Sequence, residues 1–248
     1  MLVRETATAI ADLDLDPAGL VVACRRIVER HPTSGPLWWL CASLTTSTDP
    51  FRQAWGFADH IEDDPTANLL VDLIPEDATV VVVGWPDLAG EALIRRGDLI
   101  PLVVDSNDAG SLLVRRLQRT DVEAEDVPAA GVAAAVMAAD LVLIEALATG
   151  PDAALCALGS HAAAAVAYCN QVPVWLIAGR GRRLPEPMWK TMLERLDTSD
   201  DGWHHDVEAV PLGLTTCVMG PDGLSDPNPA SMAAECPMAH ELLRLSPM

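Results

Sequence analysis

Three arginines stand together in one short stretch of the sequence. Gly179-Arg-Gly-Arg-Arg183 is the densest group of positive charges in the chain, and it contains Arg180, Arg182 and Arg183. A planar guanidinium group donates two parallel hydrogen bonds to a phosphate or a carboxylate. The cluster therefore predicts a binding site for a small phosphorylated or carboxylated metabolite. The alternative is a solvent-exposed loop, or one whose arginines pair with the chain's own carboxylates.

Acidic side chains follow three apolar runs at similar positions. Asp87, Asp105 and Glu145 each stand at the end of such a run or just beyond it. Carboxylates grouped in this way bind hard cations or sugar hydroxyls, and Asp105 or Glu145 is also a candidate general base. The alternatives are helix caps and solvent-exposed turns. We favour these over a metal centre, so no metal site is predicted.

Gly159 and Ser160 precede an alanine-rich run that predicts a helix over 160–169. The unpaired N–H groups at a helix start attract anions, so both residues are candidates for binding the same metabolite. The alternative is an ordinary N-cap made by the Ser160 hydroxyl. The two interpretations differ in whether the helix start is free for a ligand.

These residues need a scaffold, and the hydrophobic pattern predicts one of alternating strands and helices. Continuous apolar runs predict buried strands, and runs with helical spacing predict the helices between them. We therefore predict an α/β fold with a Rossmann-like parallel sheet, whose ligands bind beyond the carboxyl ends of the strands. The predicted strands cover 78–83, 99–104, 122–127, 140–145 and 172–178, and the predicted helices cover 88–96, 111–118, 132–138 and 160–169.

A small helical N-terminal domain is predicted over residues 1–65, and the Rossmann-like domain over 66–248. Asp16 and Pro17 suit the cap and the first turn of a helix in the first of these domains. Beyond the main sheet we predict a helix to residue 196, a surface loop over 198–202, short strands over 206–210 and 214–218, and a last helix over 230–243.

Several of these segments, in this order, resemble one known family. The matching segments are Asp140-Leu-Val-Leu-Ile-Glu-Ala146, Ala157-Leu-Gly-Ser160, Gln171-Val-Pro-Val-Trp-Leu-Ile-Ala178, Asp206-Val-Glu-Ala-Val-Pro211 and Gly220-Pro-Asp-Gly-Leu224. The family joins the alpha, beta and delta regulatory subunits of translation initiation factor two-B to the methylthioribose-phosphate and ribose-bisphosphate isomerases. The resemblance implies a helical N-terminal domain, a Rossmann-like C-terminal domain and a homodimer.

The sequence departs from the isomerases where the resemblance places their catalytic groups. Trp85 falls near the position of their catalytic cysteine, Leu147 near that of their catalytic aspartate, and Ala157 near a lysine of their phosphate site. Trp and Leu side chains cannot transfer a proton to or from a substrate. We therefore predict no catalytic residue, and a catalytically degenerate protein, a pseudoenzyme, that senses a ligand or interacts with another protein.

Two other functions stay open at this stage. One is an isomerase-like enzyme that acts on a small phosphorylated metabolite, such as a sugar phosphate, through the arginine cluster. In that case Trp85 stacks on the ligand, whereas the favoured interpretation is that Trp85 fills the former cavity. The other function is a protein–protein adaptor that uses Trp38, Trp39 and Trp55 on an exposed face.

The composition limits the partners that we expect. The chain carries 16 Lys+Arg against 36 Asp+Glu, for a net charge of −20, which disfavours nucleic acid and anionic membranes. No Gly-x-Gly-x-x-Gly motif follows a predicted strand, so we expect no dinucleotide and no other cofactor. The 6 cysteines are scattered and no targeting segment is visible at the start. We therefore expect a cytoplasmic protein with reduced thiols.

Overall fold

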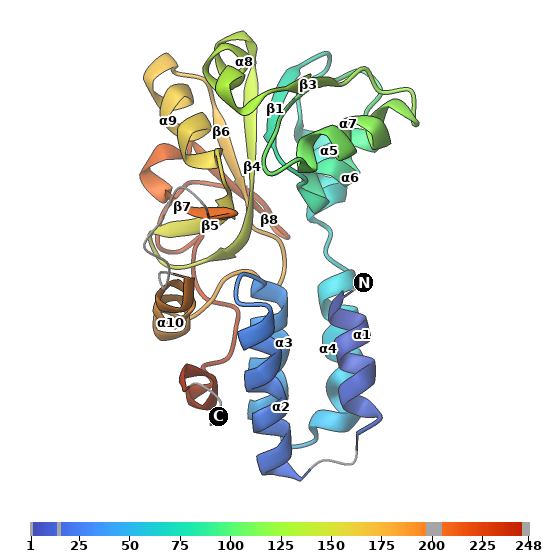
Figure 1. Ribbon diagram of the computed structural model, residues 1–248, viewed down its shortest axis with the longest axis vertical. Helices are drawn as coiled ribbons and strands as arrows, with labels where there is room; N and C mark the ends of the chain where they lie inside the picture. The colour runs from blue at the N-terminus through green and yellow to red at the C-terminus, as the bar shows by residue number, and fades with distance from the viewer. Residues whose placement is uncertain (1, 14–15, 197–204, 245–248) are drawn as a thin grey trace.

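The computed structural model of the chain describes residues 2–13, 16–196 and 205–244. A group of helices forms one end of the molecule, and a mostly parallel sheet flanked by helices forms the other (Figure 1). This arrangement confirms the predicted α/β class with a Rossmann-like sheet. The loop predicted over 198–202 lies outside the described residues.

The N-terminal helices run side by side at the lower end of Figure 1. They are α1 (Leu2–Ala11), α2 (Pro17–Arg30), α3 (Gly35–Thr46) and α4 (Pro50–Glu62). The predicted cap of α2 is present, since Asp16 Oδ1 accepts a 2.7 Å hydrogen bond from the Gly19 N–H. Trp38 and Trp39 are buried and only Trp55 of the three is exposed, so an adaptor surface built on all three tryptophans is wrong.

The main sheet has the strand order β3-β2-β1-β4-β6-β8-β9. All neighbouring pairs in this order are parallel except β8 and β9. The interior strand β1 consists almost entirely of valine, and β-branched side chains suit a strand that is covered on both faces. The strands are β1 (Thr79–Val83), β2 (Ile100–Val104), β3 (Glu125–Val127), β4 (Leu141–Thr149), β6 (Val174–Ile177), β8 (Cys217–Gly220) and β9 (Gly223–Ser225).

Helices cover both faces of this sheet, as expected for a doubly wound fold. On one face, α5 (Thr66–Leu73), α6 (Asp87–Arg95) and α7 (Ala109–Gln118) pack on strand side chains such as Val80 and Val82. On the other face, α8 (Val132–Ala138) and α9 (Ser160–Asn170) pack on Val81 and Val142. The alternation of valines along β1 between the two clusters is the physical cause of this division.

A second, antiparallel ribbon crosses the end of the main sheet. The long strand β4 continues past its parallel partners and pairs with β5 (Ala153–Ala157), which in turn pairs with β7 (Val207–Pro211). No strand is predicted at β5 from the sequence, because its five small or apolar residues show no alternation. This ribbon carries one side of the candidate site described below.

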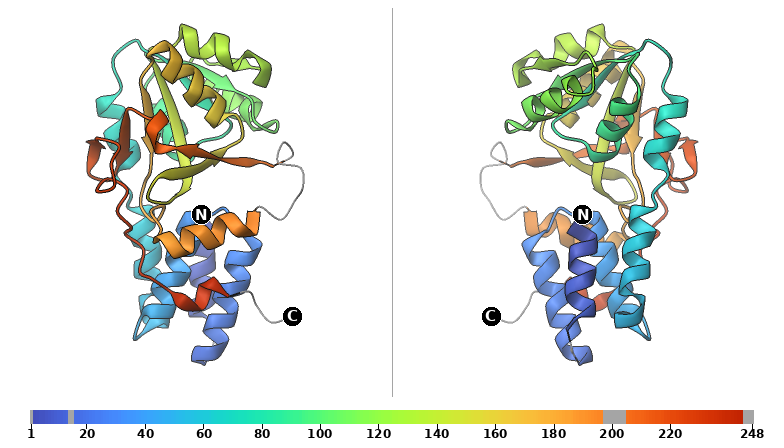
Figure 2. Two further views of the ribbon diagram at one scale, coloured as in Figure 1. Left: turned by 90° about the vertical axis from the view of Figure 1, so that its left-hand side faces the viewer. Right: turned by 90° about the vertical axis from the view of Figure 1, so that its right-hand side faces the viewer.

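The C-terminal part of the chain returns to the helical end (Figure 2). Helix α10 (Glu186–Leu196) and the short 3₁₀ helix η4 (His240–Leu243) share one hydrophobic cluster with α1 to α4. The helix predicted over 230–243 is wrong, since only His240–Leu243 are helical. Pro237 interrupts the helical pattern. In the described ranges, no helix has both the length and the apolar character needed to span a bilayer.

Candidate functional site

The turns beyond β1, β2 and β5 meet at the carboxyl edge of the sheet. Gly84 follows β1 with a φ of 66°, and a Cβ at this residue would lie 3.2 Å from the Ser106 Cβ and 3.6 Å from the Ala157 Cβ. Glycine fits here because it adopts positive φ without strain and leaves room for its neighbours. The first strand turn is therefore in direct contact with its two neighbours.

Glu145 lies on β4 at this edge and caps the start of α6. Its Oε2 accepts hydrogen bonds from the backbone N–H groups of Leu88 at 2.8 Å and Ala89 at 3.0 Å. Its Oε1 lies 2.8 Å from the Arg182 guanidinium, and both side chains are almost fully buried, with 7% and 11% of their surface exposed. The carboxylate is thus held by a helix start and by a cation at once.

The hydrogen-bond donors of Arg182 bind groups of the protein itself. Besides the pair with Glu145, its guanidinium donates to the Ala146 carbonyl, and its backbone N–H donates to Glu235 Oε1 at 3.2 Å. The alternative stated for the arginine cluster, pairing with the chain's own carboxylates, therefore describes this residue. Only 11% of the Arg182 side-chain surface is exposed, so little of it reaches solvent.

The other two arginines of the loop reach different parts of the chain. Arg183 pairs with Glu235 at 3.3 Å and donates to the Ser231 carbonyl at 3.2 Å. Arg180 donates its backbone N–H to Asp64 Oδ2 at 2.8 Å and its guanidinium to the His60 carbonyl at 3.2 Å. Loop 179–183 therefore joins α4, β4 and the C-terminal segment.

The start of α9 is capped by an acid from another strand. Gly159 has a φ of 98°, and its N–H and that of His161 donate to Glu208 Oε1 at 2.6 Å and 2.9 Å. Ser160 is buried, and no hydrogen bond from its side chain caps the helix. Glu208 thus holds the position expected for an anion, and it caps the helix in place of the Ser160 hydroxyl.

The other two acids predicted as site residues, Asp105 and Asp87, lie at helix starts. Asp105 caps the start of α7, since its carboxylate accepts from the N–H groups of Gly110 at 3.0 Å and Asp108 at 3.3 Å. Asp87 is the first residue of α6 and is exposed to solvent. Its negative charge stabilises the helix start through the helix dipole. No group of acidic, histidine or cysteine side chains in the described residues is arranged to hold a metal ion.

Trp85 lies on the surface at the mouth of the site. Its side chain is 37% exposed, and the Arg116 guanidinium lies 5.7 Å from the ring centroid. A cation over an indole ring is a favourable arrangement. Trp85 therefore packs outward against α7 and does not fill an internal cavity, contrary to the favoured prediction.

Leu147 stands on a β-bulge. The pairing of β4 with β5 shifts register between Ala146 and Ala148, so Leu147 is the extra residue. A Cβ on Gly35 of α3 would lie 2.6 Å from the Leu147 carbonyl oxygen, so the bulge also contacts the helical end closely. Bulges commonly re-aim a side chain beside an active site. Here the re-aimed side chain is a half-buried leucine, which has no acid–base chemistry.

Cys156 is a thiol on β5, close enough to Glu208, Arg182 and Glu145 to feel their charges. It is fully buried on β5, and burial raises the pKa of its thiol well above the ordinary range. The carboxylates of Glu208 and Glu145 raise the pKa further, whereas Arg182 lowers it. A thiol of raised pKa stays protonated at neutral pH and is a poor nucleophile. Cys156 is therefore a core residue, and all 6 cysteines of the chain are free.

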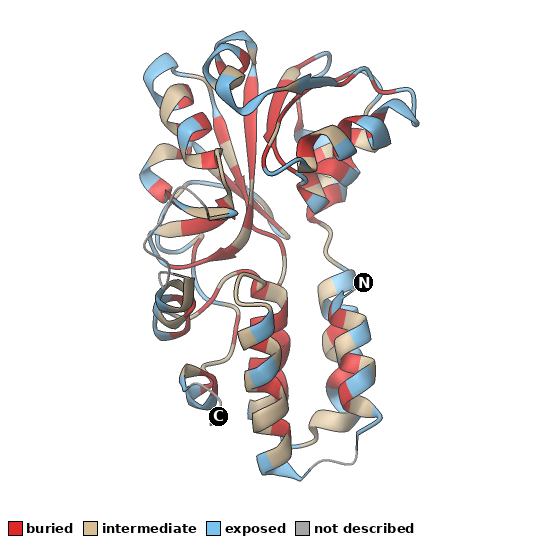
Figure 3. Ribbon diagram, viewed as in Figure 1, coloured by how far each residue is buried: buried red, intermediate tan, exposed pale blue. Residues whose placement is uncertain are grey.

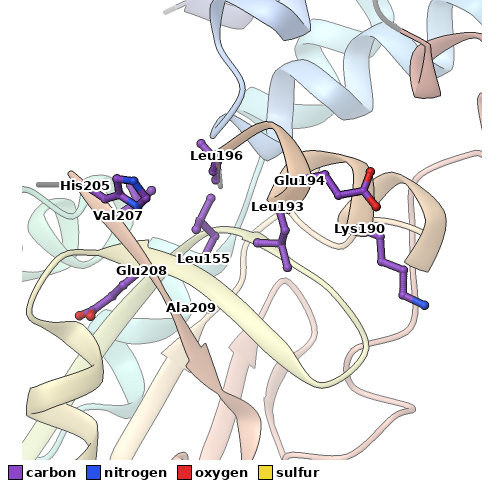
Figure 4. A pocket seen from close by; sticks show the side chains of 9 residues that line it. All are labelled: Leu155, Lys190, Leu193, Glu194, Leu196, His205, Val207, Glu208 and Ala209. Atoms are coloured by element: carbon purple, nitrogen blue, oxygen red, sulfur yellow. The ribbon is translucent and has the colours of Figure 1, made fainter. Parts of the chain in front are cut away.

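The described residues also form a cavity of about 430 Å³ on the other side of the β5–β7 ribbon (Figure 4). Its lining residues are Leu155, Lys190, Leu193, Glu194, Leu196, His205, Val207, Glu208 and Ala209. The Glu208 carboxylate points away from these leucines, toward α9. The lining thus combines apolar side chains with a lysine, a histidine and two acids.

No protein-family model matches the sequence, and no curated protein matches it. Solved structures do match over most of the chain. The Pyrococcus horikoshii OT3 translation initiation factor eIF-2B aligns with a TM-score of 0.74 and 18% identity, over 91% of this chain and 90% of that chain. The chain has the fold of an eIF2B subunit.

Two further structures agree. eIF2B beta from Chaetomium thermophilum aligns with a TM-score of 0.66 and 15% identity, over 97% of this chain and 83% of that chain. A subunit of the tetrameric eIF2B beta2-delta2 complex from C. thermophilum aligns with a TM-score of 0.71 and 14% identity. The alignment covers 91% of this chain and 82% of that chain. The eIF2B resemblance stated from the sequence is thereby confirmed at the level of the fold.

The sequence did not indicate three acids that hydrogen-bond at this edge but come from distant parts of the chain. Glu208, Asp64 and Glu235 each accept a backbone N–H near the candidate site, and each comes from an element remote in sequence. The sequence predicted a short strand over 206–210, and this was the available signal for Glu208. No signal pointed to Asp64 or Glu235, because neither stands at a predicted strand end.

Proposed function

We propose that this chain is a catalytically degenerate protein of the eIF2B fold that acts by binding, as a ligand-sensing or interaction protein. One observation carries the proposal. Internal carboxylates occupy the helix starts at the carboxyl edge of the sheet, with Glu145 at α6, Asp105 at α7 and Glu208 at α9. Substrate phosphates bind at such helix starts in α/β proteins. A phosphate would have to compete with these carboxylates for the backbone N–H groups, and their negative charges would repel it.

Four residues at or near the positions expected for catalysis also do not supply the groups that isomerisation needs. Moving a proton between two atoms of a sugar phosphate requires a base and an acid within hydrogen-bond reach. Trp85 and Leu147, at the positions where the resemblance places the catalytic pair, do not titrate. The thiol of Cys156 stays protonated, and Glu145 is held by Arg182 and two backbone N–H groups. None of these groups is free to shuttle a proton.

The proposal is tested by incubating the purified full chain with ribose 1,5-bisphosphate and with methylthioribose 1-phosphate. The reaction is followed by phosphorus NMR beside a buffer control. We expect no conversion above the buffer rate. Conversion that depends on protein concentration would overturn the assignment as a non-catalytic protein.

A second candidate, an isomerase-like enzyme for a small phosphorylated metabolite, rests on the start of α9. No cation among the described residues pairs with Glu208, so its carboxylate is held there by two N–H groups alone. A phosphate that displaced it would gain the same donors. Saturable thermal stabilisation of the unmodified protein by a sugar phosphate, followed by its turnover, would favour this candidate over the first.

We also propose that the chain is a cytoplasmic homodimer. One of the structural neighbours is a subunit of a tetrameric beta2-delta2 complex, so a subunit of this fold is known in an oligomer. The cytoplasmic location rests on free cysteines, four of which are buried without partners in disulfides, as is usual in a reducing compartment. Light scattering on the purified chain tests the oligomeric state.

A further inference from the structure

The outer surface of α8 and α9 carries no charge. Lys, Arg, Asp and Glu make up 21% of the chain, so two solvent-facing helices of this length would ordinarily carry several. Yet residues 127–139 and 153–179, which contain the two helices, include none of these four types. The two helices contact each other on the same side of the sheet (Figure 1).

This surface is apolar and exposed. Tyr168 on α9 and Met137 on α8 are 65% and 61% exposed, which makes them the most exposed large hydrophobic side chains of the described residues. Around them, Ala133, Ala134 and Ala162 are also exposed, as the outer sides of these helices show in Figure 3. Small side chains leave the helix backbones open to close approach by another surface.

A hollow continues the same surface beyond the end of α9. Its volume is about 640 Å³, and its lining comes from 168–173 and 213–216, which hold no charged residue. Tyr168 belongs to both the hollow and the helix surface. We call the α8–α9 surface with this hollow the neutral face.

We propose that the neutral face binds a second copy of this chain through a two-fold symmetric contact. The proposal rests on the homodimer proposed above and names the surface that forms it. Two copies of a chain with a net charge of −20 repel each other, and the repulsion is smallest where neither copy presents a charge. A symmetric contact needs a surface that complements itself, which an uncharged apolar face does.

Other occupants fit this face less well. A basic partner would be drawn to the acidic remainder of the surface, where it gains charge complementarity. An anionic membrane would be repelled by the same acidic remainder. In the symmetric contact, the exposed tyrosine and methionine of both copies leave water together, and side chains of these types are enriched in protein interfaces.

The test measures the mass of the full chain by size-exclusion chromatography with light scattering across a dilution series. We expect about 53 kDa, twice the 26.4 kDa of one chain. The double variant Met137→Asp/Tyr168→Asp places charges on the proposed contact, and like charges across an interface are costly. We expect its dissociation constant to rise at least ~100-fold. Both substituted side chains are exposed, so we expect its thermal unfolding to match the unmodified chain.

The matched control is Leu112→Asp on α7. Leu112 is 52% exposed and lies on the helix layer of the opposite sheet face, so this variant adds a charge without touching the neutral face. We expect it to stay dimeric. A monomeric unmodified chain, a double variant that stays dimeric, or dissociation of the Leu112→Asp control to the same degree would each overturn the proposal.

Salt gives a second measurement that does not depend on any variant. Because repulsion between the two acidic copies opposes association, added sodium chloride screens it and is expected to lower the dissociation constant. An interface held by ion pairs would respond in the opposite sense. Weakening of the dimer with rising salt would therefore contradict a contact through the neutral face. The mass measurement and the salt titration do not depend on catalytic turnover. Their outcome can therefore contradict the neutral-face contact without contradicting the proposed lack of catalysis, and the reverse also holds.

Discussion

Two helix starts at the edge of the sheet use the same device in different surroundings. At α6, the Glu145 carboxylate accepts two backbone N–H groups and is also paired with Arg182. At α9, Glu208 accepts two backbone N–H groups, and no cation of the described residues accompanies it. The first start is electrically balanced, whereas the second has only the helix dipole to stabilise the acid.

A carboxylate that stands where a phosphate would bind can therefore have one of two roles. It can be a fixed part of the structure, or it can be a cap that another anion displaces. A buried ion pair contributes to stability only while both partners are present, because either one alone is an uncompensated charge. A carboxylate on a helix start is a local cap that another anion can replace at modest cost. The start of α6 is therefore a fixed structural element, and the start of α9 is the place where anion binding is easiest to restore.

The largest expected effect is the loss of the buried pair. Arg182→Ala leaves Glu145 buried without its cation, and we expect the free energy of unfolding to fall by about 3–5 kcal/mol. Urea unfolding followed by far-UV circular dichroism measures it. Arg180→Ala is the matched control in the same loop, because its guanidinium contacts a single carbonyl. We expect a loss of about 1 kcal/mol or less there, and equal losses in the two variants would contradict the assignment.

A smaller effect is expected at α9. Glu208→Ala removes the cap and is expected to cost about 1–2 kcal/mol in buffer without phosphate. The freed N–H groups of Gly159 and His161 can then bind phosphate. We expect inorganic phosphate to raise the Tm of this variant by about 2–4 °C, the equivalent of ~1 kcal/mol for a chain of this size.

The comparison in that experiment is with the unmodified protein, in which Glu208 holds the same donors. Phosphate should stabilise the unmodified chain much less than the variant. A chloride solution of equal ionic strength separates specific binding from general screening. Equal stabilisation of the two proteins by phosphate would show that Glu208 does not occupy an anion position.

The smallest effect is expected at the third helix start, α7. Asn and Asp are about equally good N-caps, so Asp105→Asn is expected to change the free energy of unfolding by no more than about 0.5 kcal/mol. The same urea titration measures it. A loss comparable with that of Arg182→Ala would mean that Asp105 carries a charge interaction beyond the cap, and the contrast between α6 and α7 would fail.

The order of strands and helices was predictable because local patterns carry it. The valines of β1 predict a buried strand, and the alanine-rich composition of α9 predicts a packed helix. Strand β5 was not predictable, because it is defined by pairing with β4 and β7, which are joined only after the chain has folded. The failure at 230–243 has a different cause, since Pro237 interrupts the helical pattern and only His240–Leu243 are helical, as a 3₁₀ turn.

The candidate site shows the same limit at the level of side chains. The sequence pointed to Arg180, Arg182 and Arg183 at the correct edge, because position after a strand is a local property. It did not distinguish a ligand-binding cluster from an internally paired one. That distinction depends on Glu145 and Glu235, which approach the loop from remote parts of the chain. Partners of this kind are fixed by topology, not by spacing.

Loop 179–183 also governs how the molecule deforms. Through Arg180, Arg182 and Arg183 it is anchored to α4, to β4 and to the C-terminal segment. Hinge motion needs a few residues that can change φ and ψ without breaking packed contacts, and three of the five residues of this loop are held by such contacts. A rotation of the helical end against the sheet would have to break the hydrogen bonds of Arg180 with Asp64 and His60. The two ends are therefore expected to tumble and respond to force as one rigid unit.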